Sequence, residues 1–275
     1  MPQTSPTADR FHTRRLQVGG YAVDVRGTFT PGLPPMVLVH GLGMSAEYFR
    51  PYAEILAETH DVYAVDLPGY GSTPKPPHAL TIPELGEALT GVVAELALVA
   101  PVLVGHSMGC QIVADAIANN HQVYVGYILI GPTVDPAARN LPTQALRLFQ
   151  NMLAEPFATN VLVFRNYLRM GPLRHLHTVR HMLADRPEDT IRSCTVPGLV
   201  VHGDKDPVPS DEWVRELVGL APDANLREIS SGTHALHHNQ PDELAAACAQ
   251  FLTMVTGSGP SPEAPPSTQS TVEDL

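Results

Sequence analysis

Residues 101–118 read PVLVGHSMGCQIVADAIA and combine three features within eighteen positions. An uninterrupted apolar run leads to Gly105, a serine between two glycines follows, and apolar residues then recur at helical spacing. An apolar run without polar alternation is typical of a strand buried on both faces of a parallel sheet. The segment therefore predicts a buried strand, a sharp turn at Ser107 and a helix of an α/β protein.

Similar apolar runs recur along the chain and are separated by segments of helix length. We expect two opening strands at 15–25 and 25–30, with a turn at Gly19-Gly20. Further strands are expected at 36–40, 62–67, 101–107, 127–131, 198–204 and near 226–229. Helices are expected at 82–98, 108–118 and 241–255. This order predicts a mostly parallel twisted sheet with helices on both faces.

Between residues 132 and 193 the alternation stops, and three amphipathic helical patterns follow one another at 141–153, 157–170 and 173–184. An all-helical insertion before the last strands predicts a cap. The insertion holds eight of the fifteen arginines and five acids, a net charge of +3. In its third pattern, four cations lie opposite the apolar stripe: Arg174, His177, Arg180 and His181. They either lie on exposed helix faces or line an entrance that selects carboxylate-bearing substrates.

Composition narrows the function classes. The chain has 275 residues, 44% hydrophobic and 16% charged, which is ordinary for a globular protein. Its formal charge of -11 argues against general nucleic-acid binding. Three scattered cysteines are too few for a disulfide framework or a cysteine zinc site. No apolar run approaches the ~18 residues of a membrane-spanning helix, and no secretory signal is visible. We therefore expect a cytoplasmic protein with no membrane partner, ending in a disordered tail at 257–275.

The turn Gly105-His106-Ser107-Met108-Gly109 is the strongest chemical signal. A serine on a strand–turn–helix junction points its hydroxyl out of the sheet, as a nucleophile requires, whereas a chance glycine–serine turn has no such setting. The Met108 N–H, at the helix N-terminus, would stabilise an oxyanion. A second donor is expected at the Leu42 N–H, in the sequence His40-Gly41-Leu42-Gly43, which read alone is also compatible with a plain loop.

An acid and a base are available downstream. Either Asp204 or Asp206, at the end of the strand 198–204, could orient a histidine, and His234 follows the last short strand. The order Ser107, Asp206, His234 is the chain order of a triad on this architecture. Asp66, at another strand end, is interpreted as structural, closing its loop through backbone hydrogen bonds.

With these motifs in this order, the sequence resembles the α/β-hydrolase fold superfamily, in its small single-domain branch with a helical cap, from Leu16 to Val255. The resemblance implies Ser107 as nucleophile, and Asp206, three residues after Gly203, as the acid in place of Asp204. It also implies His234 as the base in preference to His237 and His238, because the family places the base in a loop.

The resemblance also has departures. Gly232 is separated from His234 by Thr233, and Tyr48 and Phe49 stand where many relatives have a tryptophan. We expect three side chains near these motifs to line the substrate pocket: His40, His106 and Tyr48. The implied organisation is an N-terminal part of the hydrolase core at 1–131, the cap at 132–193, and a C-terminal part of the core at 194–256.

The activity that follows is a serine hydrolase that cleaves a small carboxylic ester or lactone through an acyl-enzyme, with a small-molecule substrate and no cofactor. Carbon–carbon bond hydrolysis of a β-diketone-like compound uses the same triad, and perhydrolase or lyase chemistry is possible on the same frame. A non-catalytic ligand receptor is an alternative of another class. His175, His177 and His181 are close in sequence, but no cysteine or carboxylate completes a metal site, so no metal is expected. The oligomeric state is open.

Overall fold

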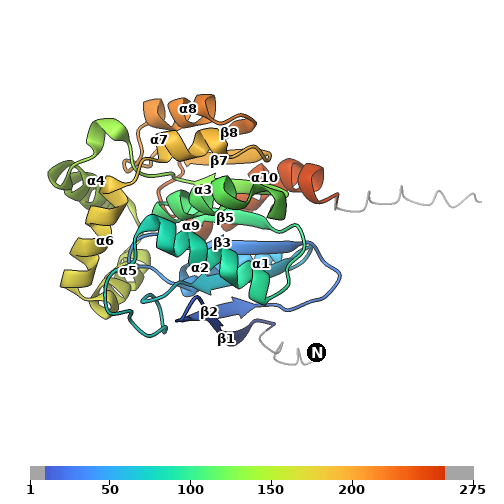
Figure 1. The fold of residues 1–275 in the computed structure, drawn as a ribbon. Coiled ribbons are helices and arrows are strands. Elements are labelled where there is room, and N and C mark those ends of the chain that lie inside the picture. Colours follow the sequence, from blue (N-terminus) through green and yellow to red (C-terminus); the bar gives the residue numbers. More distant parts are fainter. Residues whose placement is uncertain (1–9, 258–275) are drawn as a thin grey trace, which may run out of the picture.

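The apolar runs of the sequence form the strands of one sheet in the computed structural model, which describes residues 10–257 (Figure 1). Its strands, in spatial order, are β1 (His12–Val18), β2 (Tyr21–Gly27), β4 (Asp61–Asp66), β3 (Pro35–Val39), β5 (Val102–His106), β6 (Gly126–Ile130), β7 (Gly198–Gly203) and β8 (Ala224–Ile229). The pairs β1–β2 and β2–β4 are antiparallel, and every later pair is parallel. The carboxyl ends of the parallel strands therefore share one edge of the sheet.

The opening strands meet at Gly19-Gly20, as expected, but their bounds differ from the sequence-based ranges 15–25 and 25–30. β1 pairs with β2 along its whole length, with Val18 opposite Tyr21. Gly19 and Gly20 have φ angles of 58° and 85°, a region that favours glycine. A two-residue turn of this kind joins two strands directly, so no strand boundary falls at Val25.

Helices cover both faces of the sheet because the strand side chains are apolar on both faces. Met36 and Leu38 of β3 pack toward one helix layer, which contains α1 (Arg50–Leu56), α9 (Leu236–Asn239) and α10 (Pro241–Thr256). Val37 and Val39 face the other layer, which contains α2 (Ile82–Glu95), α3 (Met108–Asn120) and α8 (Asp211–Leu220). The expected helices α2, α3 and α10 are all present, whereas α1 and α8 were not predicted from the sequence.

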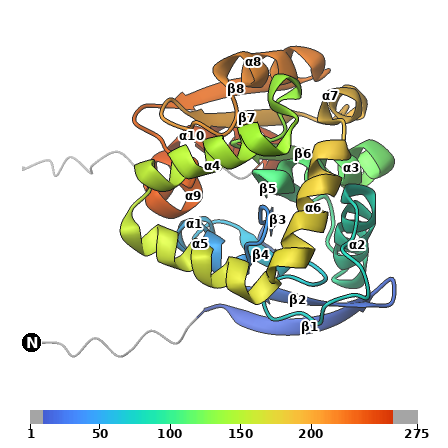
Figure 2. The ribbon, with the colours of Figure 1, turned by 90° about the vertical axis from the view of Figure 1, so that its left-hand side faces the viewer.

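Residues 132–193 contain helices and no strand, as the sequence predicts. They form α4 (Leu141–Ala154), α5 (Phe157–Met170), α6 (Pro172–Ala184) and the short α7 (Pro187–Thr190), between β6 and β7. Figure 2 shows α4, α5 and α6 arranged around the carboxyl ends of the central strands, and we call this segment the cap. Of the tail expected at 257–275, residues 258–275 lie outside the described part. Among residues 10–257, no helix has the length and hydropathy needed to span a bilayer.

Candidate active site

Ser107 occupies a strained turn between β5 and α3. Its φ and ψ are 55° and -122°, an arrangement that a serine adopts only where surrounding contacts hold it. Its N–H donates to the carbonyl of Ile130, at 2.9 Å, which ties the turn to β6. A Cβ at Gly109 would lie 2.2 Å from the Val39 carbonyl oxygen, so only glycine permits this packing of α3 on the sheet. The turn thus presents Ser107 at the carboxyl edge of the sheet.

His234 and Asp206 come together at the same edge, from the loops that follow β8 and β7. The His234 Nδ1 lies 2.7 Å from Asp206 Oδ2, and Asp206 Oδ1 accepts a hydrogen bond from the Val208 N–H at 2.8 Å. With Nδ1 donating to Asp206, Nε2 of the neutral imidazole is free to accept a proton. Asp204 is exposed instead, and His237 and His238 lie on α9.

The pKa of His234 is raised above its usual value. Burial is the largest influence and lowers the pKa, because it disfavours the charged imidazolium. The negative charge and hydrogen bond of Asp206, together with the charge of Glu155, outweigh that effect. The surroundings of His234 are therefore arranged to stabilise its protonated form.

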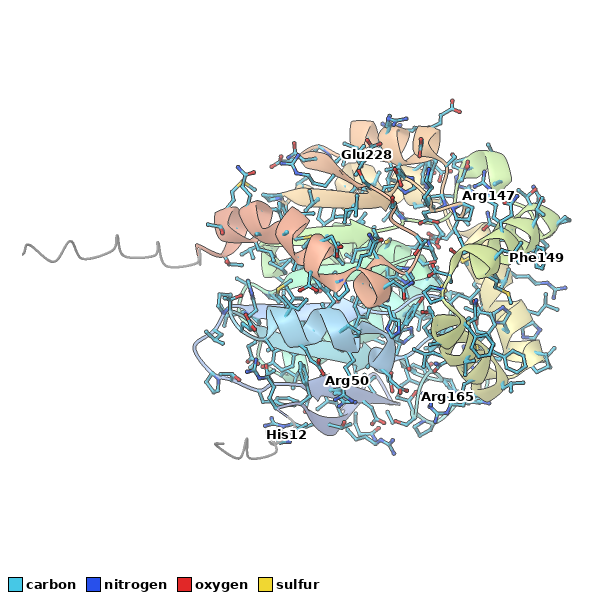
Figure 3. The ribbon with its side chains drawn as sticks, turned by 180° about the vertical axis from the view of Figure 1, so that it is seen from behind. His12, Arg50, Arg147, Phe149, Arg165 and Glu228 are labelled. Carbon is cyan, nitrogen blue, oxygen red and sulfur yellow. The ribbon has the colours of Figure 1, made fainter. Side chains whose placement is uncertain are left out.

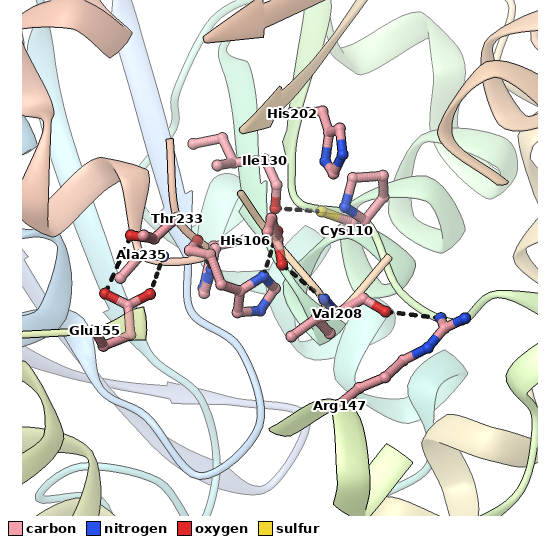
Figure 4. Close-up of polar contacts among 12 residues, drawn as sticks. His106, Cys110, Ile130, Arg147, Glu155, His202, Val208, Thr233 and Ala235 are labelled. Carbon is pink, nitrogen blue, oxygen red and sulfur yellow. Dashed lines mark hydrogen bonds and ion pairs between the residues drawn. The ribbon is translucent and has the colours of Figure 1, made fainter. Parts of the chain in front are cut away.

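Glu155 is a part of this site that the sequence did not indicate. It follows the last residue of α4 in the cap, yet its carboxylate accepts hydrogen bonds from the Ala235 N–H at 3.0 Å and the Thr233 hydroxyl at 3.2 Å (Figure 4). The Asn239 side-chain amide donates to the same carboxylate. Glu155 therefore holds both neighbours of His234. No motif surrounds this glutamate, so only tertiary structure identifies it.

The loop that carries Leu42 packs directly against Ser107. A Cβ at Gly41 would lie 3.0 Å from Ser107 Cβ, so the two backbones approach closely. Among residues 10–257, the backbone N–H groups of Leu42 and Met108 donate no hydrogen bond. Both amides thus have the free donor that an oxyanion hole requires.

Ser107 and His234 open onto a cavity of about 570 Å³ between the sheet edge and the cap. Its wall is largely apolar and includes Leu148, Val163 and Val179 from α4, α5 and α6. A cavity of this size, lined by hydrophobic side chains and a few polar groups, is typical of small-molecule sites.

The three residues expected in the pocket take different positions. Tyr48 and His106 line the cavity, and the His106 Nε2 also lies 3.0 Å from the His234 carbonyl oxygen. His40 is not among the lining residues. Its Nδ1 lies 2.9 Å from the Gly41 carbonyl oxygen, and its Nε2 accepts a long hydrogen bond from the Leu67 N–H. The His40 ring is fully buried and contacts the backbone at Gly41 and Leu67. It therefore supports the backbone of these two loops and does not line the cavity.

Asp66 fills the structural role expected for it. Its carboxylate accepts hydrogen bonds from the Ala46 N–H at 2.6 Å and the Ser72 N–H at 3.3 Å. These bonds join the loop that follows β4 to the turn before α1.

The cap cations do not line the cavity at the four positions considered from the sequence. Arg174 donates hydrogen bonds to the carbonyls of Pro76 and His78. His177 and Arg180 are exposed on the same side of α6 as Leu173 and Leu176, and not opposite them as expected. His181 is half-buried outside the lining. The interpretation that these side chains select carboxylate-bearing substrates at the entrance is therefore not supported. Within residues 10–257, no group of three or more His, Cys, Asp or Glu side chains could hold a metal ion.

Comparisons with known proteins agree with this architecture. Residues 36–247 match the model of the alpha/beta hydrolase family. The uncharacterized hydrolase YugF of Bacillus subtilis is 23% identical, covering 87% of this chain and 97% of that protein. The pimeloyl-[acyl-carrier protein] methyl ester esterase of Vibrio cholerae is 25% identical over 80% of this chain and 94% of its own. The crystal structure of a membrane phospholipase A superposes with a TM-score of 0.76 at 20% identity, covering 89% and 86% of the two chains, a likeness of fold.

Proposed function

This chain belongs to the alpha/beta hydrolase family, and on that premise we propose that it is a serine hydrolase that cleaves carboxylic esters or lactones of small molecules. The observation that carries the proposal is the convergence of Ser107 and the His234–Asp206 pair on one apolar cavity. The esterase activity in the name of the Vibrio cholerae relative supports the ester class.

In the proposed reaction, the Ser107 oxygen attacks the ester carbonyl carbon while His234 Nε2 accepts the hydroxyl proton. Asp206 holds the imidazole in the required tautomer through Nδ1 and stabilises the imidazolium that forms. The N–H groups of Leu42 and Met108 stabilise the negative oxygen of the tetrahedral intermediate. The carbon–oxygen bond of the ester then breaks, and the leaving alkoxide takes the proton from His234.

A water molecule completes the cycle. His234 accepts a proton from the water as it attacks the acyl carbon, and the bond to Ser107 breaks as the serine oxygen regains a proton. The products are a carboxylic acid and an alcohol. The apolar cavity wall would bind the acyl or alcohol group by excluding water, since few polar side chains line it.

The test is turnover of p-nitrophenyl acetate together with labelling by a fluorophosphonate, which reacts with activated serines. Ser107→Ala should lower kcat by several orders of magnitude and abolish labelling, because the nucleophile is lost. Asp204→Asn, a change at an exposed carboxylate near the site, is the matched control and should retain most activity. Near-normal turnover by Ser107→Ala, label on another residue, or turnover of β-diketones without esters or lactones would contradict the proposal.

A further inference from the structure

The cap exposes an unusual concentration of large apolar side chains. Fourteen such side chains are exposed among residues 10–257, and eleven of them lie on α4, α5 and α6. They are Leu141, Leu146, Phe149, Met152, Leu153, Phe157, Val161, Phe164, Leu168, Leu173 and Leu176, which we call the apolar cap surface. Phe157 is 84% exposed, and Phe149 lies on the outer side of the cap (Figure 3). Soluble monomers rarely expose so many large apolar groups together, so the surface indicates an interaction site.

Helix α5 presents its apolar side outward. Phe157, Val161, Phe164 and Leu168 recur at spacings of four, three and four residues, which places them on one face. The buried residues of the same helix are Thr159, Asn166 and Met170, so two of the three are polar. A surface helix in water normally buries its apolar stripe and exposes polar residues, and α5 reverses much of that pattern. Its outer face is thus suited to an apolar environment.

The apolar cap surface continues into the cavity. Leu141, Met152, Leu168 and Leu176 belong to the exposed set and also line the cavity that contains Ser107. An acyl chain that contacts the outer surface could therefore move into the cavity along apolar side chains. Because the surface and the cavity share these residues, we expect the surface to serve the proposed reaction and not the binding of an unrelated partner.

The charge of the cap helices favours one occupant. Residues 141–184 contain five arginines and one acid, Glu155, which is buried, although the whole chain has a formal charge of -11. Arg147 and Arg165 form ion pairs with Asp135 and Glu47, and Arg169 lines a hollow that also contains Asp24 and Glu47. Arg180 is exposed one helical turn after Leu176 of the apolar cap surface. Apolar and cationic side chains together fit the interface of an anionic lipid bilayer. Cap-to-cap pairing with a second copy would instead bring two positive segments together.

We infer that the apolar cap surface docks on anionic lipid surfaces and that the substrates are esters whose acyl chains reside in lipid, an inference that rests on the proposed hydrolase function. The expectation that the protein has no membrane partner was based on the absence of a spanning segment, and peripheral docking needs none. Phe and Leu side chains enter the interfacial region while Arg180 meets the lipid headgroups. An acyl chain then passes along the exposed leucines to Ser107.

Flotation with vesicles separates docking from catalysis. Ser107→Ala, which leaves the lipid intact, should bind vesicles of phosphatidylglycerol and phosphatidylcholine, bind pure phosphatidylcholine vesicles more weakly, and lose affinity as salt rises. Adding Phe157→Ser and Phe164→Ser should weaken binding about tenfold or more, because two exposed aromatic anchors are removed. The matched control adds Val99→Ser and Met254→Ser, which remove similarly exposed apolar groups outside the cap, and should bind as before.

Hydrolysis makes the two proposals separable. With Ser107 intact, the Phe157→Ser/Phe164→Ser variant should hydrolyse soluble p-nitrophenyl acetate at the normal rate but lose activity on a long-chain ester presented in anionic vesicles. Normal turnover of the soluble ester without vesicle binding would overturn lipid docking alone. Vesicle binding without any ester turnover would overturn the proposed function. A wild-type dimer that the Phe variant converts to monomer would assign the surface to a second copy and overturn lipid docking. Failure to bind vesicles together with capture of an acidic protein partner would overturn it as well.

Discussion

Replacing Glu155 by glutamine removes one negative charge from beside His234 while keeping the size of the side chain. The two oxygens of the Glu155 carboxylate accept three hydrogen bonds, from the Ala235 N–H, the Thr233 hydroxyl and the Asn239 side-chain amide. Glutamine has one oxygen and one NH₂ group, so at least one of these donors then faces another donor.

The magnitude follows from that lost bond. A hydrogen bond to a charged group contributes about 1.5–3 kcal/mol to the free energy of unfolding. For a chain of this size that loss lowers Tm by about 3–12 °C. The substitution also weakens the bonds that hold Thr233 and Ala235, the two neighbours of His234. Displacing a catalytic group by about 1 Å can lower the rate about a hundredfold. We therefore expect kcat of Glu155→Gln to fall by about 10- to 100-fold.

The pH dependence identifies a positioning role. His234 accepts a proton only when it is neutral, so activity is lost as pH falls through its pKa. Because Glu155 is one of the charges that raise the pKa of His234, its removal should lower that pKa. The acid limb of the kcat/KM profile should then move to lower pH.

The assay is p-nitrophenyl acetate hydrolysis between pH 5 and 9, with thermal unfolding measured on the same samples. Glu188→Gln is the control, because Glu188 is a half-buried cap carboxylate whose ion-pair partners among residues 10–257 are Arg139, at 2.6 Å, and Arg186, at 3.6 Å. It should lower Tm without moving the acid limb. If folded Glu155→Gln kept the wild-type kcat and the wild-type acid limb, Glu155 would have no role in positioning His234.

Three further outcomes are expected. Asp206→Asn should lower kcat by roughly 10⁴-fold, because loss of a triad acid leaves the imidazole in the wrong tautomer. Asp204→Asn should change kcat little. Steady-state kinetics that show the reverse ranking would assign the acid to Asp204. Burial lowers the pKa values of His106 and His237 well below that of free imidazole, so the unfolded chain binds more protons at acid pH. The free energy of unfolding should therefore fall as pH drops below about 6.5, and His237→Phe should reduce that slope in denaturant titrations; an unchanged slope would refute the assignment. Gly41→Ala should reduce kcat, because its Cβ would press on the Ser107 Cβ at 3.0 Å, and a fully active variant would show that the loop can move aside.

Much of the fold was readable because its signals are local. Buried strands have no polar alternation, so the runs near β3 to β7 were visible without any knowledge of their partners. The bounds of α5 coincide with the predicted range 157–170, since helical periodicity extends over several turns. α1 and α8 were missed, because short helices carry too few repeats to produce a clear pattern.

The sequence alone determined the family and the identity of the candidate triad, because motif order along the chain carries that information. It left Asp204 and Asp206 equivalent until the resemblance separated them, and the structure then placed Asp206 against His234 at 2.7 Å. Only tertiary structure revealed Glu155, which lies 79 positions before His234 in the chain, and the outward direction of the apolar cap surface. The physical reason is the same for both. Helical periodicity defines which residues share a face, but the packing of each helix on its neighbours decides whether that face meets the core, a cavity or solvent.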